Sequence, residues 1–327
     1  MPSSPYPIVP LITSLREHDL LSLGAMSRQD VETLFATAAA LKKDVRPYRN
    51  ALDGRSVAML FEKPSLRTRV SFEVGIHKLG GHAVYLDHSE QRLGERETIA
   101  DYGHNLERWV DAIVARVYKQ TILEGLSDAS RVPVINALSD LHHPCQALAD
   151  YLTLREKFPK RAWNDIRLAY VGDGNNVCHS LVELGAILGV HVTVLTPPGR
   201  NPSTPIMKQC ASFAAKSGST IKVSHDLADI AGHDAVYTDV WVSMGQGRET
   251  ERVRELFRPF QVNANLMGLA SRSLSSGQRT LFMHCLPAHR GSEVTDDVID
   301  AAESVVFDQA ENRMHAQMAL LVHMLCG

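Results

Sequence analysis

Short apolar runs rich in β-branched residues alternate with stretches of helical periodicity through nearly the whole chain. This alternation is typical of parallel strands joined by crossing helices, so it predicts an α/β fold. Four runs of the first half are expected to be strands: 56–61, 82–86, 112–117 and 132–137. Five runs of the second half are expected to be strands: 167–171, 191–195, 235–238, 280–283 and 304–307.

A helix is predicted between the two halves. Residues 144–158 carry leucines on one side, and Pro159 ends the pattern. The 327 residues fit two domains of about 150 residues each. We place the boundary in this helix, with a first domain at 1–147 and a second at 148–310. The periodic C-terminal helix, with its part from 311 to 327, is expected to join the first domain.

Composition and charge narrow the class of protein. Hydrophobic residues make up 44% of the chain and charged residues 22%, as in globular proteins with a buried core. A net charge of -3 gives no overall basic field, so no nucleic-acid partner is expected. The five cysteines lack a C-x-x-C pair, and neither a targeting pattern nor a continuous apolar run of roughly 18 residues is present. We therefore expect a cytoplasmic protein without a membrane partner, a disulfide framework or a metal site.

The segment FEKPSLRTR, residues 61–69, follows the first predicted strand and opens a helix. Ser65 is expected at the helix N-cap, with Arg67, Thr68 and Arg69 in the first turn. Free backbone N–H groups, the helix dipole, hydroxyls and guanidinium groups together suit a phosphate. The alternative is a capped helix with solvated arginines, but cations at a helix N-terminus oppose the dipole unless an anion offsets them. The segment therefore indicates a phosphate-binding turn.

This segment resembles the phosphate motif of the aspartate/ornithine carbamoyltransferase family. Three further blocks agree with it, in order along the chain: HPCQ at 143–146, DVWVSMG at 239–245 and HCLP at 284–287. The last two resemble the ornithine rather than the aspartate enzymes. The resemblance implies two doubly wound parallel-sheet domains with the active site between them, the first for carbamoyl phosphate and the second for ornithine. It also implies carbamoyl transfer to the δ-amine of L-ornithine, giving L-citrulline and phosphate in arginine metabolism.

The resemblance assigns roles to particular residues. Those expected to bind carbamoyl phosphate are Ser65, Leu66, Arg67, Thr68, Gln91, Arg116, His143, Gln146, Cys285, Leu286 and Arg313. Those expected to bind ornithine are Asn176, Asp239, Ser243 and Met244. The residues assigned to catalysis are Arg116, His143, Asp239 and Cys285.

The chemistry of the reaction supports these roles. Attack on a carbamoyl carbon builds negative charge on its oxygen while phosphate departs, so donors must face both places. His143 lies after a predicted strand, where ligands of α/β proteins bind, although a buried structural histidine is the alternative. Asp239 can pair with the α-ammonium group of ornithine, and an inert core role is the alternative for Cys285. The nucleophile belongs to the substrate, so no Ser-His-Asp arrangement is required.

Two other segments bear on cofactors and partners. VGDGNN at 171–176 is a poor dinucleotide fingerprint, because its third position is Val177 and no acidic residue follows the next strand. No cofactor is therefore expected. The family that the chain resembles commonly has a glutamine in the loop after the second strand, which serves the carbamoyl phosphate site of a neighbouring subunit. In SEQRLG at 89–94, Gln91 is the candidate for this glutamine, but an alignment shifted by one position would place Arg92 there. The resemblance thus implies a homotrimer, or a multiple of trimers, with a shared site.

Three alternatives stay open at this point. One is a transcarbamoylase that acts on an acylated ornithine or another amino acid. The others are a nicotinamide-dependent oxidoreductase and a non-catalytic anion-binding regulator. The poor fingerprint argues against the oxidoreductase, and the joint presence of residues for both substrates argues against the regulator.

Overall fold

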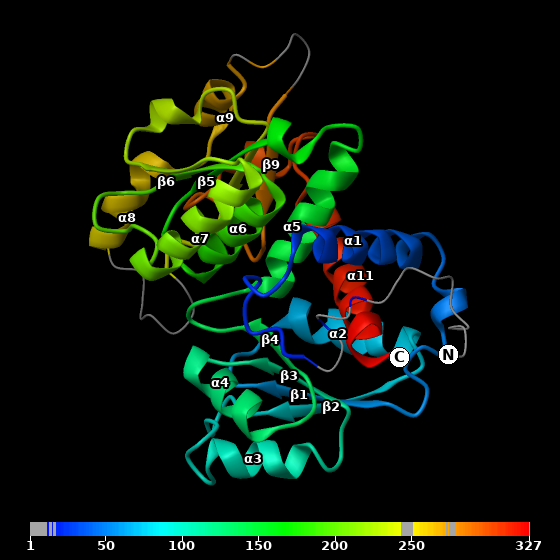
Figure 1. The fold of residues 1–327 in the computed structure, drawn as a ribbon. Coiled ribbons are helices and arrows are strands. Elements are labelled where there is room, and N and C mark those ends of the chain that lie inside the picture. Colours follow the sequence, from blue (N-terminus) through cyan, green and yellow to red (C-terminus); the bar gives the residue numbers. More distant parts are fainter. Residues whose placement is uncertain are drawn as a thin grey trace. The chain divides into compact units, whose positions relative to one another are not determined.

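The computed structural model describes residues 12, 15, 18–242, 251–272, 274 and 279–326. The chain divides into two compact units. Unit 1 contains Met1–Ala149 and Glu311–Gly327, and unit 2 contains Asp150–Ala310. Each unit is built on a parallel sheet (Figure 1). Within the described ranges, no helix is both long and apolar enough to cross a membrane.

The sheet of unit 1 has the strand order β2-β1-β3-β4, and all its pairings are parallel. Its strands are β1 (Ser56–Phe61), β2 (His82–Asp87), β3 (Ala112–Arg116) and β4 (Val134–Leu138). The helices of this unit are α1 (Arg28–Lys43), η1 (Arg46–Tyr48), α2 (Leu66–Lys78), α3 (Ile99–Leu106) and α4 (Gln120–Ala129). Two further helices, α5 (Pro144–Lys157) and α11 (Val306–Leu325), have residues in both units.

Helices cover both faces of the first sheet (Figure 1). Alternate residues of β1 and β3, such as Ala58 and Ile113, pack in one core cluster with Leu106 of α3 and Leu123 of α4. α2 and α11 lie on the opposite face. Since β1 and β3 are buried on both faces, their sequences read as continuous apolar runs.

The sheet of unit 2 has the order β7-β6-β5-β8-β9, again with parallel pairings throughout. Its strands are β5 (Arg167–Val171), β6 (His191–Leu195), β7 (Ile221–Ser224), β8 (Ala235–Thr238) and β9 (Leu281–His284). The longer helices of this unit are α6 (Asn176–Leu188) and α7 (Thr204–Ser217). The shorter ones are η2 (Trp163–Asp165), η3 (Leu227–Ile230), α8 (Glu251–Phe257), η4 (Arg258–Phe260), α9 (Ala264–Ala270) and α10 (Asp296–Ile299).

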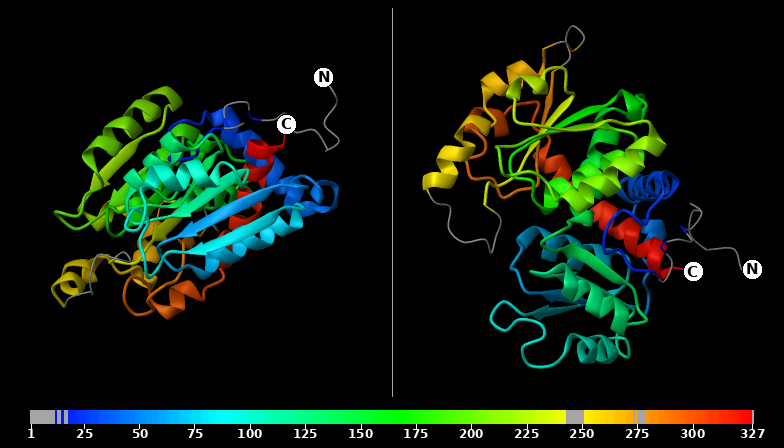
Figure 2. Two further views of the ribbon diagram at one scale, coloured as in Figure 1. Left: turned by 90° about the horizontal axis from the view of Figure 1, so that it is seen from below. Right: turned by 60° about the vertical axis from the view of Figure 1, so that its left-hand side comes forward.

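The second sheet is also covered on both faces. α6 and α7 pack against each other on one face, and α9 lies on the other, where Figure 2 shows α7 in yellow-green and α9 in gold. The cluster on the α9 face contains Val171, Val236 and Phe282 of the sheet together with Leu266 of α9. Two parallel, doubly covered sheets confirm the predicted doubly wound α/β fold.

Most predicted strands are observed, and two differences are informative. The predicted strand at 304–307 is wrong: Ser304 forms an isolated bridge with Phe282, and α11 begins at Val306. Strand β7 was not predicted, because this edge strand is short and only partly buried, so its sequence lacks a continuous apolar run.

Both sheets contain a point where the strand order reverses, between β1 and β3 in unit 1 and between β5 and β8 in unit 2. In doubly wound sheets, ligands bind outside the carboxyl ends of the strands at such points. The segment FEKPSLRTR follows β1, Arg116 ends β3, and Asp239 follows β8. The fold therefore places the predicted site residues where each sheet can bind a ligand.

Candidate active site

The turn after β1 has the geometry of a capped helix start. Ser65 is the N-cap of α2 in an extended conformation, and its hydroxyl oxygen accepts from the Thr68 N–H at 3.2 Å. The Ser65 hydroxyl also donates to Thr68 Oγ1 at 3.0 Å. Leu66 is the first residue of α2, so its N–H is one of those that a helix leaves without a partner inside the helix. The predicted N-cap is confirmed.

Thr68 links the turn to two arginines from other parts of unit 1. Arg313 of α11 donates to Thr68 Oγ1 at 2.8 Å, and Arg116 at the end of β3 reaches the same oxygen at 3.5 Å. The other terminal nitrogen of Arg313 donates to Gln146 Oε1 at 3.0 Å. All four side chains are buried. Four predicted carbamoyl phosphate residues therefore form one contiguous hydrogen-bonded cluster.

His143 lies among the cations of this cluster. Burial lowers its pKa well below the usual value, and Arg313, Arg116, Lys63 and Arg67 lower it further by repulsion. A positive imidazole is disfavoured beside these charges, so His143 is neutral at physiological pH. A neutral ring can donate a hydrogen bond to a substrate oxygen without adding a positive charge to the site.

Three other residues of unit 1 behave differently. The Leu66 side chain is 74% exposed, so only its backbone is directed into the turn. Arg69, expected in the same cradle, stacks on Tyr85 at 3.8 Å from the ring centroid and bonds Glu73 at 3.3 Å. Gln91 is exposed in the loop after β2. Arg69 therefore does not belong to the buried cluster.

Unit 2 holds a second group of predicted residues. Asp239 follows β8 and is buried. One of its carboxylate oxygens accepts from Asn175 Nδ2 at 2.8 Å, and the other accepts from the Cys285 thiol at 3.0 Å. Asn175 is the N-cap of α6, where its side-chain oxygen also accepts from the N–H groups of Val177 and Cys178. Asp239 is thus held by residues that follow β5 and β9.

Cys285 is a neutral thiol in this arrangement. Burial raises its pKa well above the usual value, and the neighbouring Asp239 carboxylate raises it further. Because the thiol donates its hydrogen to Asp239, the negative charge of the pair stays on the carboxylate. Asp239, rather than Cys285, is therefore the group that can attract a cationic substrate.

The other predicted residues of unit 2 are placed as follows. Asn176 is the first residue of α6 and is buried, and its side-chain oxygen accepts from the Val177 N–H at 3.0 Å. Leu286 has a φ of 56°, and its N–H donates to His284 Nδ1 at 2.8 Å. Cys285 and Leu286, which were also expected to bind carbamoyl phosphate, both belong to unit 2. Ser243 and Met244 lie outside the described residues.

Sequence reasoning missed three buried residues within or next to the predicted motifs. Asn176 was predicted as a site residue and Asn175 was not, although both follow β5. Lys63 lies within the phosphate motif and is buried, and burial with repulsion from Arg116 lowers its pKa to about 8. Glu62 is a buried carboxylate that accepts from the N–H groups of Leu93 and Tyr118. Two ionisable residues directly after an apolar strand were the available signal for Glu62 and Lys63.

One cluster in unit 2 has the composition of a metal site. Asp239, His284 and Cys285 offer ligand atoms that lie within 4.8 Å of one another. However, His284 Nδ1 accepts from the Leu286 N–H at 2.8 Å, and its Nε2 lies 3.2 Å from Glu293. Both ring nitrogens of His284 are therefore engaged by other groups of the fold. The arrangement suits an Asp239 carboxylate that binds an amine better than it suits a bound metal ion.

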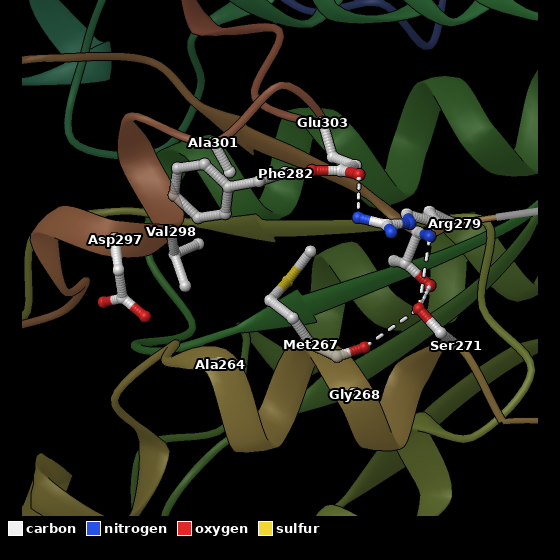
Figure 3. Close-up of a pocket in the computed structure, with 11 residues that line it drawn as sticks. Ala264, Met267, Gly268, Ser271, Arg279, Phe282, Asp297, Val298, Ala301 and Glu303 are labelled. Carbon is white, nitrogen blue, oxygen red and sulfur yellow. Dashed lines mark hydrogen bonds and ion pairs between the residues drawn. The ribbon is translucent and has the colours of Figure 1, made fainter.

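A cavity of about 340 Å³ lies elsewhere in unit 2 (Figure 3). It is lined by apolar residues of α9 and β9, among them Met267 and Phe282. Arg279 and Glu303 at its edge bond each other at 2.8 Å. None of the predicted site residues that the structure describes lines this cavity, so the reaction is not assigned to it.

Comparison with known proteins agrees with the geometry. Residues 18–156 match the family described as "Aspartate/ornithine carbamoyltransferase, carbamoyl-P binding domain", and residues 164–324 match its "Asp/Orn binding domain". The ornithine carbamoyltransferase of Shewanella oneidensis is 51% identical over 302 residues, which are 92% of this chain and 97% of that protein. A Pyrococcus furiosus protein named "Ornithine carbamoyltransferase, anabolic" is 49% identical over 321 residues, or 97% and 99% of the two chains.

A solved structure of ornithine carbamoyltransferase from Pyrococcus furiosus superposes with a TM-score of 0.90 at 48% identity. The match covers 97% of this chain and 99% of that one. This chain therefore belongs to the aspartate/ornithine carbamoyltransferase family.

Proposed function

We propose that this protein is an enzyme that transfers the carbamoyl group of carbamoyl phosphate to the δ-amine of L-ornithine, giving L-citrulline and phosphate. The observation that carries the proposal is the buried cluster in which Arg313 bonds both Thr68 of the phosphate turn and Gln146 of the HPCQ block. The relatives named ornithine carbamoyltransferase support the choice of substrates. Because one relative is named anabolic, we further propose a role in arginine synthesis.

In unit 1, the phosphate would be bound by Ser65, the backbone of Leu66, Arg67 and Thr68. Cations and helix N–H groups are the donors that phosphate oxygens prefer. Arg116 would reach both the phosphate and the carbamoyl oxygen, and Gln146 would accept from the carbamoyl amide. Lys63 would add a further positive charge to the same anion site.

In unit 2, Asp239 would pair with the α-ammonium group of ornithine, and Asn176 would bind its carboxylate end. Ser243 and Met244 would contribute further contacts to ornithine. Asn175 would keep the carboxylate oriented through its hydrogen bond of 2.8 Å. The Cys285 thiol would face the δ-amine, which must be neutral to attack. Leu286 is also predicted to contact carbamoyl phosphate, and its carbonyl oxygen would accept a hydrogen bond from the carbamoyl amide.

The chemical step then needs no resident nucleophile. The δ-nitrogen lone pair forms a bond to the carbamoyl carbon, and the bond from that carbon to the phosphate oxygen breaks. Negative charge that develops on the carbamoyl oxygen would be stabilised by Arg116 and by neutral His143, and charge on the leaving phosphate by the arginine cluster. The proton that the amine loses can leave with phosphate, whose dianion is basic enough to accept it.

We also propose a trimer in which Gln91 serves the carbamoyl phosphate site of an adjacent copy. α2 carries an apolar exposed row, with Leu66 74%, Val70 46% and Val74 37% exposed. These residues are four positions apart and lie on one side of the helix that begins at the phosphate turn. An exposed apolar row next to an active-site turn suits contact with a second copy.

The free thiols of all five cysteines support the proposed cytoplasmic location.

A citrulline assay with purified protein tests the proposed reaction. We expect citrulline only when both carbamoyl phosphate and ornithine are present, without added metal or nucleotide. Light scattering tests the trimer, with Val70→Glu expected to weaken it because a charge would be placed in the apolar row. Absence of citrulline at any pH, with a folded protein, would show that the proposed reaction is wrong.

A further inference from the structure

The loop between β2 and α3, residues 88–98, is anchored to the phosphate turn by one buried carboxylate. Glu62 is 1% exposed and directly precedes Lys63 of that turn. Its Oε1 accepts from the Leu93 N–H at 3.0 Å, and its Oε2 accepts from the Tyr118 N–H at 2.8 Å. The loop after β2 and the turn after β3 are therefore tied to the same side chain. A buried carboxylate without such partners would be costly. These two hydrogen bonds therefore hold the loop in place.

Tyr118 adds a second connection between the loop and the turn. The Lys63 ammonium lies 4.6 Å from the centroid of the Tyr118 ring, and the Arg92 guanidinium lies 4.5 Å from it. Such cation–ring distances are attractive. Arg92 therefore stacks on Tyr118 of its own chain. Both Arg92 and Gln91 are exposed, but the stacking gives Arg92 a partner within its own chain, which favours Gln91 as the residue offered to a neighbouring site.

The loop leaves Gln91 outside these contacts. Leu93 is buried in the core cluster of unit 1, and Gly94 turns the chain with a φ of 88°. The backbone oxygen of Gln91 lies 3.3 Å from His88 Nδ1, while its side chain is exposed. A residue with a fixed backbone and an exposed polar side chain suits a contact with another molecule.

We propose that Glu62 is a positioning residue that holds the 88–98 loop so that Gln91 is presented to the carbamoyl phosphate site of an adjacent copy, and that Arg92 supports the loop by stacking on Tyr118. This inference rests on the proposed function and its shared site. Glu62 acts through the loop and touches no substrate. Its substitution must therefore impair the neighbouring site and leave its own phosphate turn competent.

Steady-state kinetics give the first test. In Glu62→Gln the side chain keeps its size, but its amide offers one acceptor and presents an N–H group to the second backbone donor. We expect the KM for carbamoyl phosphate to rise roughly tenfold, with a much smaller change in the KM for ornithine. Gln91→Ala, an exposed position that cannot unfold the core, should give the same pattern. Glu124→Gln, the same change at an exposed site on α4, should leave both constants unaltered.

Mixed trimers give the decisive test. Glu62→Gln and Arg67→Ala chains with different tags are produced together, and assemblies that carry both tags are purified. In a closed ring of three, each mixed trimer contains one site that combines an intact turn with an intact loop. We therefore expect about a third of the wild-type activity per trimer from two variants that are each strongly impaired. Binding of carbamoyl phosphate, measured by calorimetry, should recover in the same proportion.

The outcomes separate the inference from the proposed reaction. Recovery in mixed trimers supports the positioning role, because a defect confined to its own subunit could not be repaired by a neighbour. If Gln91→Ala mixtures recover and Glu62→Gln mixtures do not, Glu62 acts in its own site and the inference is wrong. If wild-type protein makes citrulline and neither mixture recovers, the loop does not serve a neighbour and the inference fails while the reaction stands. If the wild type makes no citrulline, the calorimetric recovery still decides the inference.

Discussion

Arg313 donates to Thr68 Oγ1 at 2.8 Å, although 245 positions separate the two residues. Arg313 lies on the last helix, α11, whereas Thr68 lies in the first turn of α2. The C-terminal helix therefore contributes directly to the buried hydrogen-bonded cluster of unit 1. Unfolding of α11 would remove a guanidinium group from the phosphate turn and from Gln146 at once.

Arg67→Lys should damage the enzyme severely although the charge is kept. An ammonium group cannot reproduce the planar, two-pronged contact of a guanidinium with phosphate oxygens. We expect a loss of about 2 kcal/mol or more of transition-state stabilisation, measured as kcat/KM for carbamoyl phosphate. Arg69→Lys is the matched control, since Arg69 stacks on Tyr85 outside the cluster. Equal effects of the two substitutions would contradict the assigned role of Arg67.

Cys285→Ser should weaken the use of ornithine more than the use of carbamoyl phosphate. The thiol donates to Asp239 at 3.0 Å, and a shorter hydroxyl side chain would disturb the carboxylate proposed to bind the amino acid. We expect the KM for ornithine to rise several-fold, while the KM for carbamoyl phosphate changes about twofold or less. Cys326→Ser, at a partly exposed thiol of unit 1, provides the control. A parallel loss for both substrates would indicate a packing role for Cys285.

Sequence patterns were sufficient for the elements that are governed by local chemistry. The bounds of β1, β5, β6 and β8 match the prediction, because buried parallel strands are continuous apolar runs between polar loops. The N-cap role of Ser65 was also predictable, since the capping hydrogen bond spans only three positions. In contrast, the β-branched run at 304–307 resembled a strand, but tertiary packing makes it the start of α11.

Side-chain partnerships between distant segments were not predictable in the same way. The pairing of Asn175 with Asp239 joins the ends of two strands, and no periodic pattern marks which of two adjacent asparagines will make it. The same is true of Arg92, whose stacking on Tyr118 depends on the folded loop. The resemblance supplied Arg313, because its link to Thr68 has no local signal.

The pH dependence should reflect Lys63, whose pKa is lowered to about 8 mainly by burial and then by repulsion from Arg116. At saturating ornithine, kcat/KM for carbamoyl phosphate reports the free enzyme and should fall roughly tenfold as the pH rises through this value. Lys63→Arg should abolish the fall, because arginine keeps its charge. Lys63→Met should give a lower and flatter profile.

The stability of the ligand-free protein should change with pH in the opposite direction. The folded pKa of Lys63 lies below the ordinary value of 10.5, so the unfolded chain binds more protons between about 8 and 10.5. The contribution of Lys63 to the free energy of unfolding should therefore rise with pH across this window. Urea unfolding of the wild type and Lys63→Met would isolate that contribution as their difference. A difference that is constant with pH would exclude a depressed pKa for Lys63.

The Asp239 carboxylate should determine the choice between ornithine and N-acetylornithine as substrates. Asp239 is buried and holds the negative charge of its pair with Cys285, so it suits a free α-ammonium group. An acylated nitrogen would leave this carboxylate without a cationic partner, which costs several kcal/mol when the charge is buried. We therefore expect free ornithine to be preferred by a factor on the order of a hundred or more in kcat/KM.

Leu66 provides the control for this preference. Its side chain is 74% exposed, and only its backbone belongs to the phosphate turn, so Leu66→Thr should leave the ratio of the two substrates unchanged. Asp239→Asn should instead reduce the ratio, because a neutral amide no longer favours a cation. Competition assays with both substrates at one pH would measure the ratio directly. A better rate with N-acetylornithine, or a reversal of the order by Leu66→Thr, would show that Asp239 does not bind the α-ammonium group and that the acylated substrate belongs to this site.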